Sequence, residues 1–112
     1  MLEDIKPGDV VRAPFTFTDL STQKVRPALI LALAVMDDAI LAAITSNTTL
    51  RDRFDYQLID WQEAGLDKVS VVRLTKLYTL NRTQFQSVVG HLSKRERISY
   101  REFAVQRLKI SA

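Results

Sequence analysis

The sequence predicts a mainly β domain, a small and strongly curved sheet or barrel with one α-helix at its C-terminal end. Short apolar or alternating segments separated by turn residues recur from Val10 to Leu92, a pattern typical of strands. A capping-box pattern, Ser93 with Glu96 three residues later, then opens one helical segment. The chain has 112 residues, 46% of them apolar, which is enough for one core. We therefore expect a single domain over residues 1–112.

The first half of the chain is predicted to contain three strands. Turn residues at 6–9 precede a short strand at 10–13, and Pro14 suits the end of an edge strand because it cannot donate to a ladder. The polar stretch 15–25 is predicted to be a long loop. Residues 28–35 are continuously apolar, which by periodicity fits a buried strand or a helix. Their length, Pro27 and the turn at Asp37-Asp38 favour a strand, paired in a hairpin with residues 39–45.

The second half is predicted to add shorter strands and one helical turn. Residues 54–59 alternate apolar and polar side chains, as in a half-buried strand. Residues 61–65 resemble one helical turn closed by glycine. A strand at 69–73 is expected to break near Thr75 and resume through 77–78, and residues 86–92 form the last strand.

The C-terminal helix is predicted to begin after Ser93 and to end near Lys109. Its apolar residues fall on one arc, with Arg101 interrupting the arc and Phe103 outside it. The residues of this arc are Ile98, Ala104, Val105 and Leu108.

Composition excludes several kinds of chemistry. The chain has no cysteine and a single histidine, which removes disulfides, Cys/His metal sites, cysteine nucleophiles and any Ser-His-Asp triad without His91. We expect no metal cluster and no cofactor. The acidic N-terminus lacks the features of a secretory signal, and the longest apolar run, 27–36, is too short to span a bilayer. These features predict a cytoplasmic protein without membrane contact.

A mildly basic balance is compatible with a polyanionic partner. Sixteen Lys and Arg residues against thirteen Asp and Glu give a net charge of +3, a value that many plain globular domains share. His91, at the base of the predicted helix, is expected to make a structural hydrogen bond rather than to act in catalysis.

Arg26 is the first candidate for chemistry. It lies where a polar loop meets a buried strand, with Pro27 fixing the chain behind it, so a rigidly held guanidinium could bind a phosphate with paired donors. The alternative is a loop-base arginine that forms an ordinary ion pair with Asp9 or Asp19.

Small polar residues at the ends of strands are the second candidate. Thr45, Ser46 and Asn47 follow an apolar strand directly, where hydroxyls and an amide could bind phosphate oxygens or a 2′-OH, or could merely satisfy the strand's last backbone groups. Alternation places Arg73 and Thr75 together on the face opposite their apolar neighbours. An exposed sheet-face arginine is the alternative for Arg73.

Nearby loops supply further candidates. Lys24, Arg51 and Arg53 are loop cations that could bind a phosphate backbone, although such charges usually form only a solvated surface. Phe17 is a possible ring for stacking on a base.

Eight segments, in order and at compatible spacing, resemble the MazF/PemK toxin family over nearly the whole chain. They are Lys6-Pro7-Gly8-Asp9-Val10-Val11, Pro14-Phe15 with Phe17-Thr18-Asp19, Lys24-Val25-Arg26-Pro27-Ala28-Leu29-Ile30, Ala42-Ala43-Ile44-Thr45-Ser46-Asn47, Gly65-Leu66, Ser70-Val71-Val72-Arg73-Leu74, Leu77-Tyr78-Thr79-Leu80 and Gly90-His91-Leu92-Ser93.

The resemblance implies an SH3-like barrel of about six or seven short strands with a C-terminal helix, assembled as a homodimer. It implies a toxin that cuts single-stranded RNA at a short sequence without metal, through a 2′,3′-cyclic phosphate, and that a cognate antitoxin protein silences. Arg26 matches the arginine of the family's Arg-Pro motif and Thr45 its strand-end threonine, so the resemblance makes both catalytic. The phosphate-binding and base-binding residues would then be Phe17, Lys24, Ser46, Asn47, Arg51, Arg53, Arg73 and Thr75.

Two departures from the family pattern bear on activity. The segment 20–25 has neither the glycine nor the acid common before the Arg-Pro motif, and Thr75 stands where many relatives have an acid. A weakened or inactive enzyme is therefore one alternative, and a non-catalytic RNA-binding module on the same barrel is another. A third is a gyrase-poisoning toxin of the same fold, which would act through its terminal helix.

Overall fold

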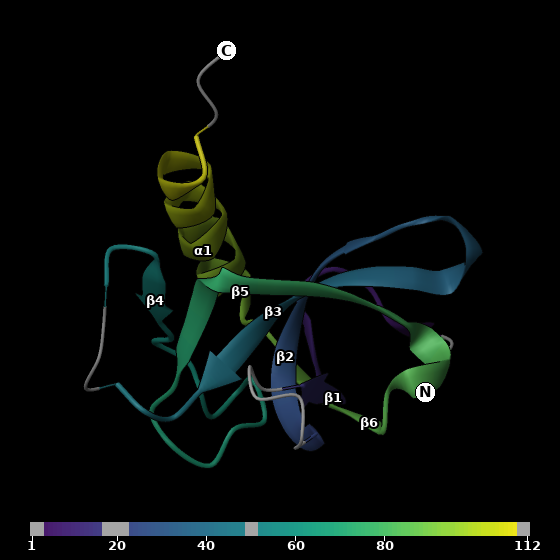
Figure 1. Cartoon of the computed structure of the whole chain (residues 1–112). Coiled ribbons are helices and arrows are strands. Elements are labelled where there is room, and N and C mark those ends of the chain that lie inside the picture. Colours follow the sequence, from purple (N-terminus) through teal and green to yellow (C-terminus); the bar gives the residue numbers. More distant parts are fainter. Residues whose placement is uncertain (1–3, 17–22, 49–51, 110–112) are drawn as a thin grey trace.

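The computed structural model describes residues 4–16, 23–48 and 52–109. One antiparallel sheet of six strands, in the order β4-β5-β3-β2-β1-β6, is followed by a C-terminal helix (Figure 1). The mainly β prediction is confirmed, and six strands fall within the expected number. The elements are β1 (Asp9–Thr16), β2 (Gln23–Leu33), the 3₁₀ turn η2 (Val35–Asp37), β3 (Asp38–Thr45), β4 (Asp55–Gln57), β5 (Val71–Asn81), the 3₁₀ turn η3 (Arg82–Gln84), β6 (Ser87–His91) and α1 (Lys94–Arg107).

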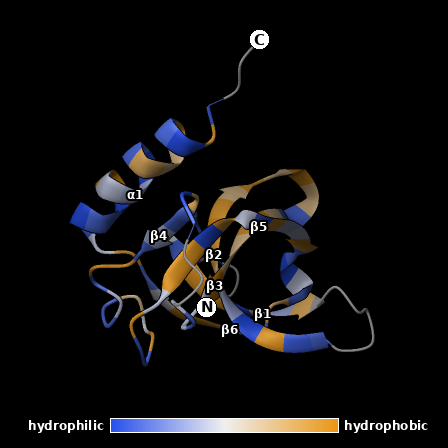
Figure 2. Cartoon of the chain, turned by 60° about the vertical axis from the view of Figure 1, so that its left-hand side comes forward, coloured by the Kyte–Doolittle hydropathy of each residue, from blue (hydrophilic) through white to orange (hydrophobic). Residues whose placement is uncertain are grey.

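The sheet is curled, and each of its faces carries its own apolar cluster. Register shifts interrupt the pairing of β1 with β6, of β2 with β3 and of β3 with β5, and such bulges bend a sheet. One cluster is centred on Val10, Leu29 and Ala42 and is partly covered by α1, whereas the other includes Val11 and Ile30. Figure 2 shows hydrophobic residues along the central strands, with α1 to one side of the sheet near β4.

Two strands are longer than the sequence predicted. β1 continues through Pro14 to Thr16, and β2 already begins at Gln23, so the predicted loop at 15–25 was too long. The pairing of β1 with β6 ends at Arg12. Pro14 therefore lies where β1 lacks a paired neighbour on one side, and a missing N–H is tolerated there. The predicted hairpin of residues 28–35 with 39–45 is confirmed, with its turn at Val35–Asp37.

The interruption predicted near Thr75 is a bulge inside one continuous strand. Leu77 pairs with Ala42, and the next pair, Arg73 with Ala43, skips three residues of β5. The strand therefore continues, but the alternation of its side chains shifts at this point. Arg73 pairs with Ala43 at one end of the bulge, whereas Thr75 lies inside it and has no partner in β3.

The face of α1 that packs on the sheet differs from the predicted arc. Tyr100 and Phe103 pack against the core, whereas Ile98 and Val105 are 57% and 63% exposed. Ser93 caps the helix as predicted, accepting the Glu96 backbone N–H at 3.2 Å. Within the described ranges, no helix is long and apolar enough to cross a membrane.

Candidate functional site

An open groove of about 700 Å³ runs over the ends of β2, β3 and β5 and along the loop that precedes β5. Basic side chains dominate its charged lining. The described residues that line it are Arg12, Phe15, Arg26, Pro27, Ala43, Ile44, Thr45, Ser46, Asn47, Gly65, Leu66, Asp67, Lys68, Ser70, Arg73, Lys76 and Val89.

Arg26 and Thr45 come together because their strands are hydrogen-bonded neighbours. Ala28 of β2 pairs with Ala43 of β3. Arg26 lies two residues before Ala28, and Thr45 lies two residues after Ala43. Because side chains alternate along a strand, both face the same side of the sheet as that pair. Both residues line the groove. Two neighbouring strands of the sheet therefore bring a guanidinium and a hydroxyl to the same groove.

The hydroxyl of Thr45 has a defined orientation. Its Oγ1 accepts the backbone N–H of Asn47 at 3.0 Å. Because one lone pair of the oxygen is used in this way, the hydroxyl hydrogen remains for a ligand in the groove. Ser46 and Asn47 line the groove at the same strand end. The segment therefore satisfies a backbone group at the end of the strand and also lines the groove, so the two interpretations of it are compatible.

Arg73 is held against a buried carboxylate. In the ladder it pairs with Asp55 of β4, and its Nη2 lies 3.8 Å from Asp55 Oδ2, with side-chain exposures of 22% and 1%. The other oxygen, Asp55 Oδ1, is buried without a hydrogen-bond partner among the described residues. The arginine is therefore neither simply exposed nor fully buried. One side of it is anchored to Asp55, and it also lines the groove.

The loop between β4 and β5 forms a wall of the groove through a close backbone contact. A Cβ atom on Gly65 would lie 2.0 Å from the carbonyl oxygen of Val89, and one on Gly90 would lie 2.3 Å from that of Ala64. Gly65 also has a φ of +86°, a conformation that glycine adopts readily. The loop can therefore approach β6 only because both positions are glycine. The predicted turn at 61–65 is present, with the Ala64 N–H donating to the Asp60 carbonyl at 3.2 Å.

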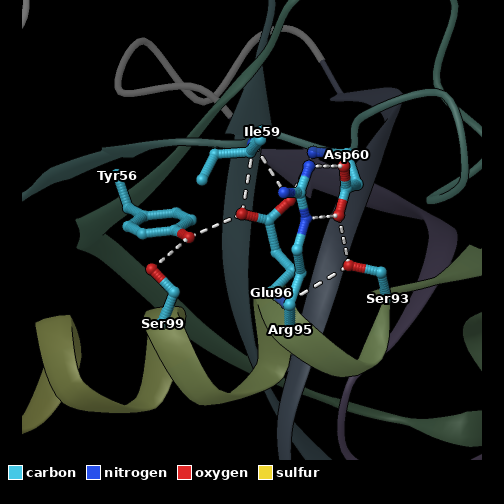
Figure 3. Close-up of polar contacts among 7 residues, drawn as sticks. All are labelled: Tyr56, Ile59, Asp60, Ser93, Arg95, Glu96 and Ser99. Carbon is cyan, nitrogen blue, oxygen red and sulfur yellow. Dashed lines mark hydrogen bonds and ion pairs between the residues drawn. The ribbon is translucent and has the colours of Figure 1, made fainter.

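The start of the same loop is fastened to α1 by Glu96 (Figure 3). The Glu96 carboxylate accepts the Tyr56 hydroxyl at 2.5 Å and the backbone N–H groups of Ile59 and Asp60 at 2.9 and 2.7 Å. Glu96 is 1% exposed. The Tyr56 hydroxyl also contacts Ser99 Oγ at 3.0 Å. Glu96 thus does not close a capping box with its own helix. It ties the helix to the loop that lines the groove.

Electrostatics stabilise this connection further. Burial, reinforced by the hydrogen bond to Glu96, raises the pKa of Tyr56 to about 12. Hydrogen bonds from Arg95 and then Ser93 hold the pKa of Asp60 well below its ordinary value. Arg95 donates to both Asp60 oxygens, at 2.8 and 2.6 Å. The tyrosine therefore stays neutral and the aspartate stays charged at neutral pH.

The groove gathers about half of the residues predicted from the sequence. Arg26, Thr45, Ser46, Asn47 and Arg73 line it. Phe17 and Arg51 lie outside the described residues.

Other candidates lie elsewhere. Three predicted residues are exposed and do not line the groove: Lys24, Arg53 and Thr75. Arg53 lies over the Phe54 ring at 5.1 Å, and its carbonyl accepts from Arg107. His91 is exposed beside a second, shallower depression.

Three cations that line the groove were not predicted: Arg12, Lys68 and Lys76. The alternation within 71–75 predicted Thr75 as the site residue beside Arg73. The strand has a bulge here, and Lys76 lines the groove instead. No group of three or more potential metal-ligating side chains occurs in the described ranges.

Comparison with known proteins gives a family for this arrangement. The model of the PemK-like, MazF-like toxins of type II toxin–antitoxin systems matches residues 6–99, most of the chain. The chain belongs to the MazF/PemK toxin family. The match spans the whole groove, from Arg12 to Val89. A search of curated protein sequences gives no match.

Solved structures of a toxin, of an endoribonuclease and of a MazE–MazF complex share this fold. The Mycobacterium tuberculosis toxin MazF-mt6 superposes with a TM-score of 0.70 at 19% identity, covering 93% of this chain and 99% of that one. An endoribonuclease in complex with its cognate antitoxin, from a mycobacterial species, gives 0.70 at 13% identity over 96% and 98%. The Deinococcus radiodurans MazE–MazF structure gives 0.68 at 20% identity over 96% and 97%. At these identities the likeness establishes the MazF-like fold.

Proposed function

We propose that this protein is the toxin of a toxin–antitoxin pair and an endoribonuclease that cuts single-stranded RNA in the groove. The observation that supports this most is that Arg26 and Thr45, from neighbouring strands, line one groove together with four further cations. Such a groove attracts a polyanion. Family membership and the endoribonucleases that share the fold support the same activity.

The chemistry fits residues that include neither cysteine nor, within the described lining, histidine. In the proposed reaction the 2′-hydroxyl of the RNA loses its proton and its oxygen bonds to the adjacent phosphorus. The bond to the 5′-oxygen breaks and that oxygen takes up a proton, which leaves a 2′,3′-cyclic phosphate and a 5′-hydroxyl. The protein need not supply a nucleophile or a metal. It must align the 2′-oxygen with the leaving oxygen and stabilise the charge that develops on the phosphate.

Each predicted residue then has a physical role. Arginine stays protonated in proteins, so Arg26 acts by donating hydrogen bonds to the charged phosphate oxygens. Thr45 donates the hydroxyl hydrogen that its contact with Asn47 leaves available. Arg73, anchored on Asp55, binds a neighbouring phosphate, and Ser46 and Asn47 offer polar contacts at the same strand end.

The proposed biological setting follows the family. We infer a homodimeric, cytoplasmic toxin that a cognate antitoxin protein holds inactive. A relative that shares the fold is an endoribonuclease in complex with its cognate antitoxin, which supports an antitoxin partner for this chain.

One digestion tests the activity. Purified protein is incubated with an unstructured RNA in the presence of a chelator, and the new ends are identified at nucleotide resolution. We expect cuts at a short sequence, with 5′-hydroxyl ends and 2′,3′-cyclic phosphates that phosphatase cannot remove. Stoichiometric binding without product after long incubation would contradict the proposal and favour a binding module. Inhibited DNA supercoiling with intact RNA would favour the gyrase-poisoning alternative.

A further inference from the structure

One carboxylate stands among the cations of the groove. Of the described residues that line it, Arg12, Arg26, Lys68, Arg73 and Lys76 are basic, and Asp67 alone is acidic. A negative charge in a groove that receives a polyanion opposes binding. Its presence there would be offset if the ligand offered hydrogen-bond donors at that point.

Asp67 does not serve as an internal ion-pair partner. The salt bridges among the described residues are Lys6–Asp9, Arg73–Asp55, Arg82–Asp37 and Arg95–Asp60. Asp67 is exposed and, within the described ranges, its side chain accepts no hydrogen bond from a side chain or backbone group. Both carboxylate oxygens are therefore available to a ligand in the groove.

The backbone on either side of Asp67 is fixed. Leu66 packs against the core cluster, and its N–H donates to the Trp61 carbonyl at 3.1 Å. On the other side, the Ser70 hydroxyl donates to the Lys68 carbonyl at 2.8 Å. The close contact of Gly65 with the backbone of β6 also fixes the position of this loop. The backbone that carries the Asp67 side chain is therefore held in place, which lowers the entropy cost of ordering this residue on a ligand.

The chemistry of a carboxylate selects among RNA bases. Unpaired bases are read on their Watson–Crick edges. Guanine presents two adjacent donors there, N1–H and the N2 amine, which match the two oxygens of a carboxylate. Adenine and cytosine present one amine beside an acceptor, and uracil presents one N–H between two acceptors. An acceptor opposite a carboxylate is repelled.

We propose that Asp67 is a specificity-determining residue that reads the Watson–Crick edge of a guanine in the RNA. The inference rests on the proposed function and deepens it. The surrounding cations bind the phosphates of any sequence, whereas the carboxylate admits the base that offers paired donors. Asp67 thereby converts a general polyanion groove into a selective one.

The test compares Asp67→Asn with Glu63→Gln. Glu63 is an exposed carboxylate on the same loop, and it lines the second depression instead of the groove. Both substitutions replace a carboxylate by an amide and therefore change the net charge equally. Each protein digests a single-stranded RNA library with randomised positions, and base frequencies around the cuts are counted. We expect guanine to be favoured about tenfold or more at one position by the wild type and by Glu63→Gln, and Asp67→Asn to lose that preference.

A second substrate isolates the contact. Inosine in place of that guanosine keeps N1–H and lacks the N2 amine. We expect the substitution to slow the wild type severalfold and to leave Asp67→Asn unaffected. If the wild type cuts RNA without a guanine preference, or Asp67→Asn retains it, the inference is wrong and the proposed function stands. If the wild type cuts no RNA, both fail.

Discussion

Replacing Glu96 by alanine should remove much of the stability of the fold. The buried carboxylate accepts the Tyr56 hydroxyl and the backbone N–H groups of Ile59 and Asp60. After the substitution, Tyr56 keeps its contact with Ser99, but the two backbone donors lose their acceptor. A buried donor without a partner costs about 1–3 kcal/mol. With the cavity added, we expect a loss of about 3–5 kcal/mol, against a total of roughly 5–15 kcal/mol for a small domain.

Glu96→Gln is the matched control. Its amide oxygen can still accept from Ile59 and Asp60, and its amide N–H can donate to the Tyr56 oxygen, whose own hydrogen then points to Ser99. Only the charge-assisted part of the network is lost, about 1 kcal/mol. Urea unfolding at one fixed protein concentration measures all three proteins. Equal losses for the two variants, or an unchanged midpoint for Glu96→Ala, would refute the role assigned to this network.

Three further variants probe other parts of the structure. Asp55→Asn removes the buried charge beside Arg73 and should cost about 1–3 kcal/mol in urea unfolding, less than a fully buried pair because Arg73 is partly exposed; an unchanged midpoint would contradict the anchoring. The lowered pKa of Asp60 means that its contribution to stability is complete above about pH 4 and is lost as the pH falls through the folded-state value. The midpoint temperature of thermal unfolding should therefore fall more steeply below pH 4 for the wild type than for Asp60→Asn. Parallel plots of this temperature against pH would contradict the prediction. Gly65→Ala should lose about 1–3 kcal/mol more than Gly8→Ala, because both glycines have positive φ but only Gly65 would press a Cβ against backbone; equal losses in urea unfolding would show that the contact with β6 yields.

The sequence predicted the strands well where apolar runs were bounded by turn residues, as at 28–35 and 39–45. It failed at the polar ends of β1 and β2, because those residues pair through backbone groups that leave no hydropathy pattern. The predicted buried face of the helix was also wrong, because hydropathy alone did not decide which side packs on the sheet. The orientation of α1 follows the hydrogen bonds of buried Glu96, and its apolar Ile98 and Val105 stay exposed.

The site shows the same division. Arg26 and Thr45 could be predicted because they flank strands of one hairpin, and pairing brings such ends together. Lys76 could not, because a bulge in β5 decides which side chain reaches the groove. Lys68 and Asp67 belong to a loop whose position depends on the contact of Gly65 with β6. A glycine in the sequence does not reveal which backbone it will meet.

Arg26 is proposed to stabilise charge on a phosphate during RNA cleavage, and the cleavage rate of Arg26→Ala measures that role. Single-turnover cleavage of one RNA would be compared among the wild type, Arg26→Ala and Arg101→Ala, the last being an exposed arginine of α1 outside the groove. We expect Arg26→Ala to be slower by about 10²–10³-fold, as when one charge-stabilising donor is removed, and Arg101→Ala to match the wild type. An Arg26→Ala protein that folds normally and cuts at the wild-type rate would contradict this role for Arg26.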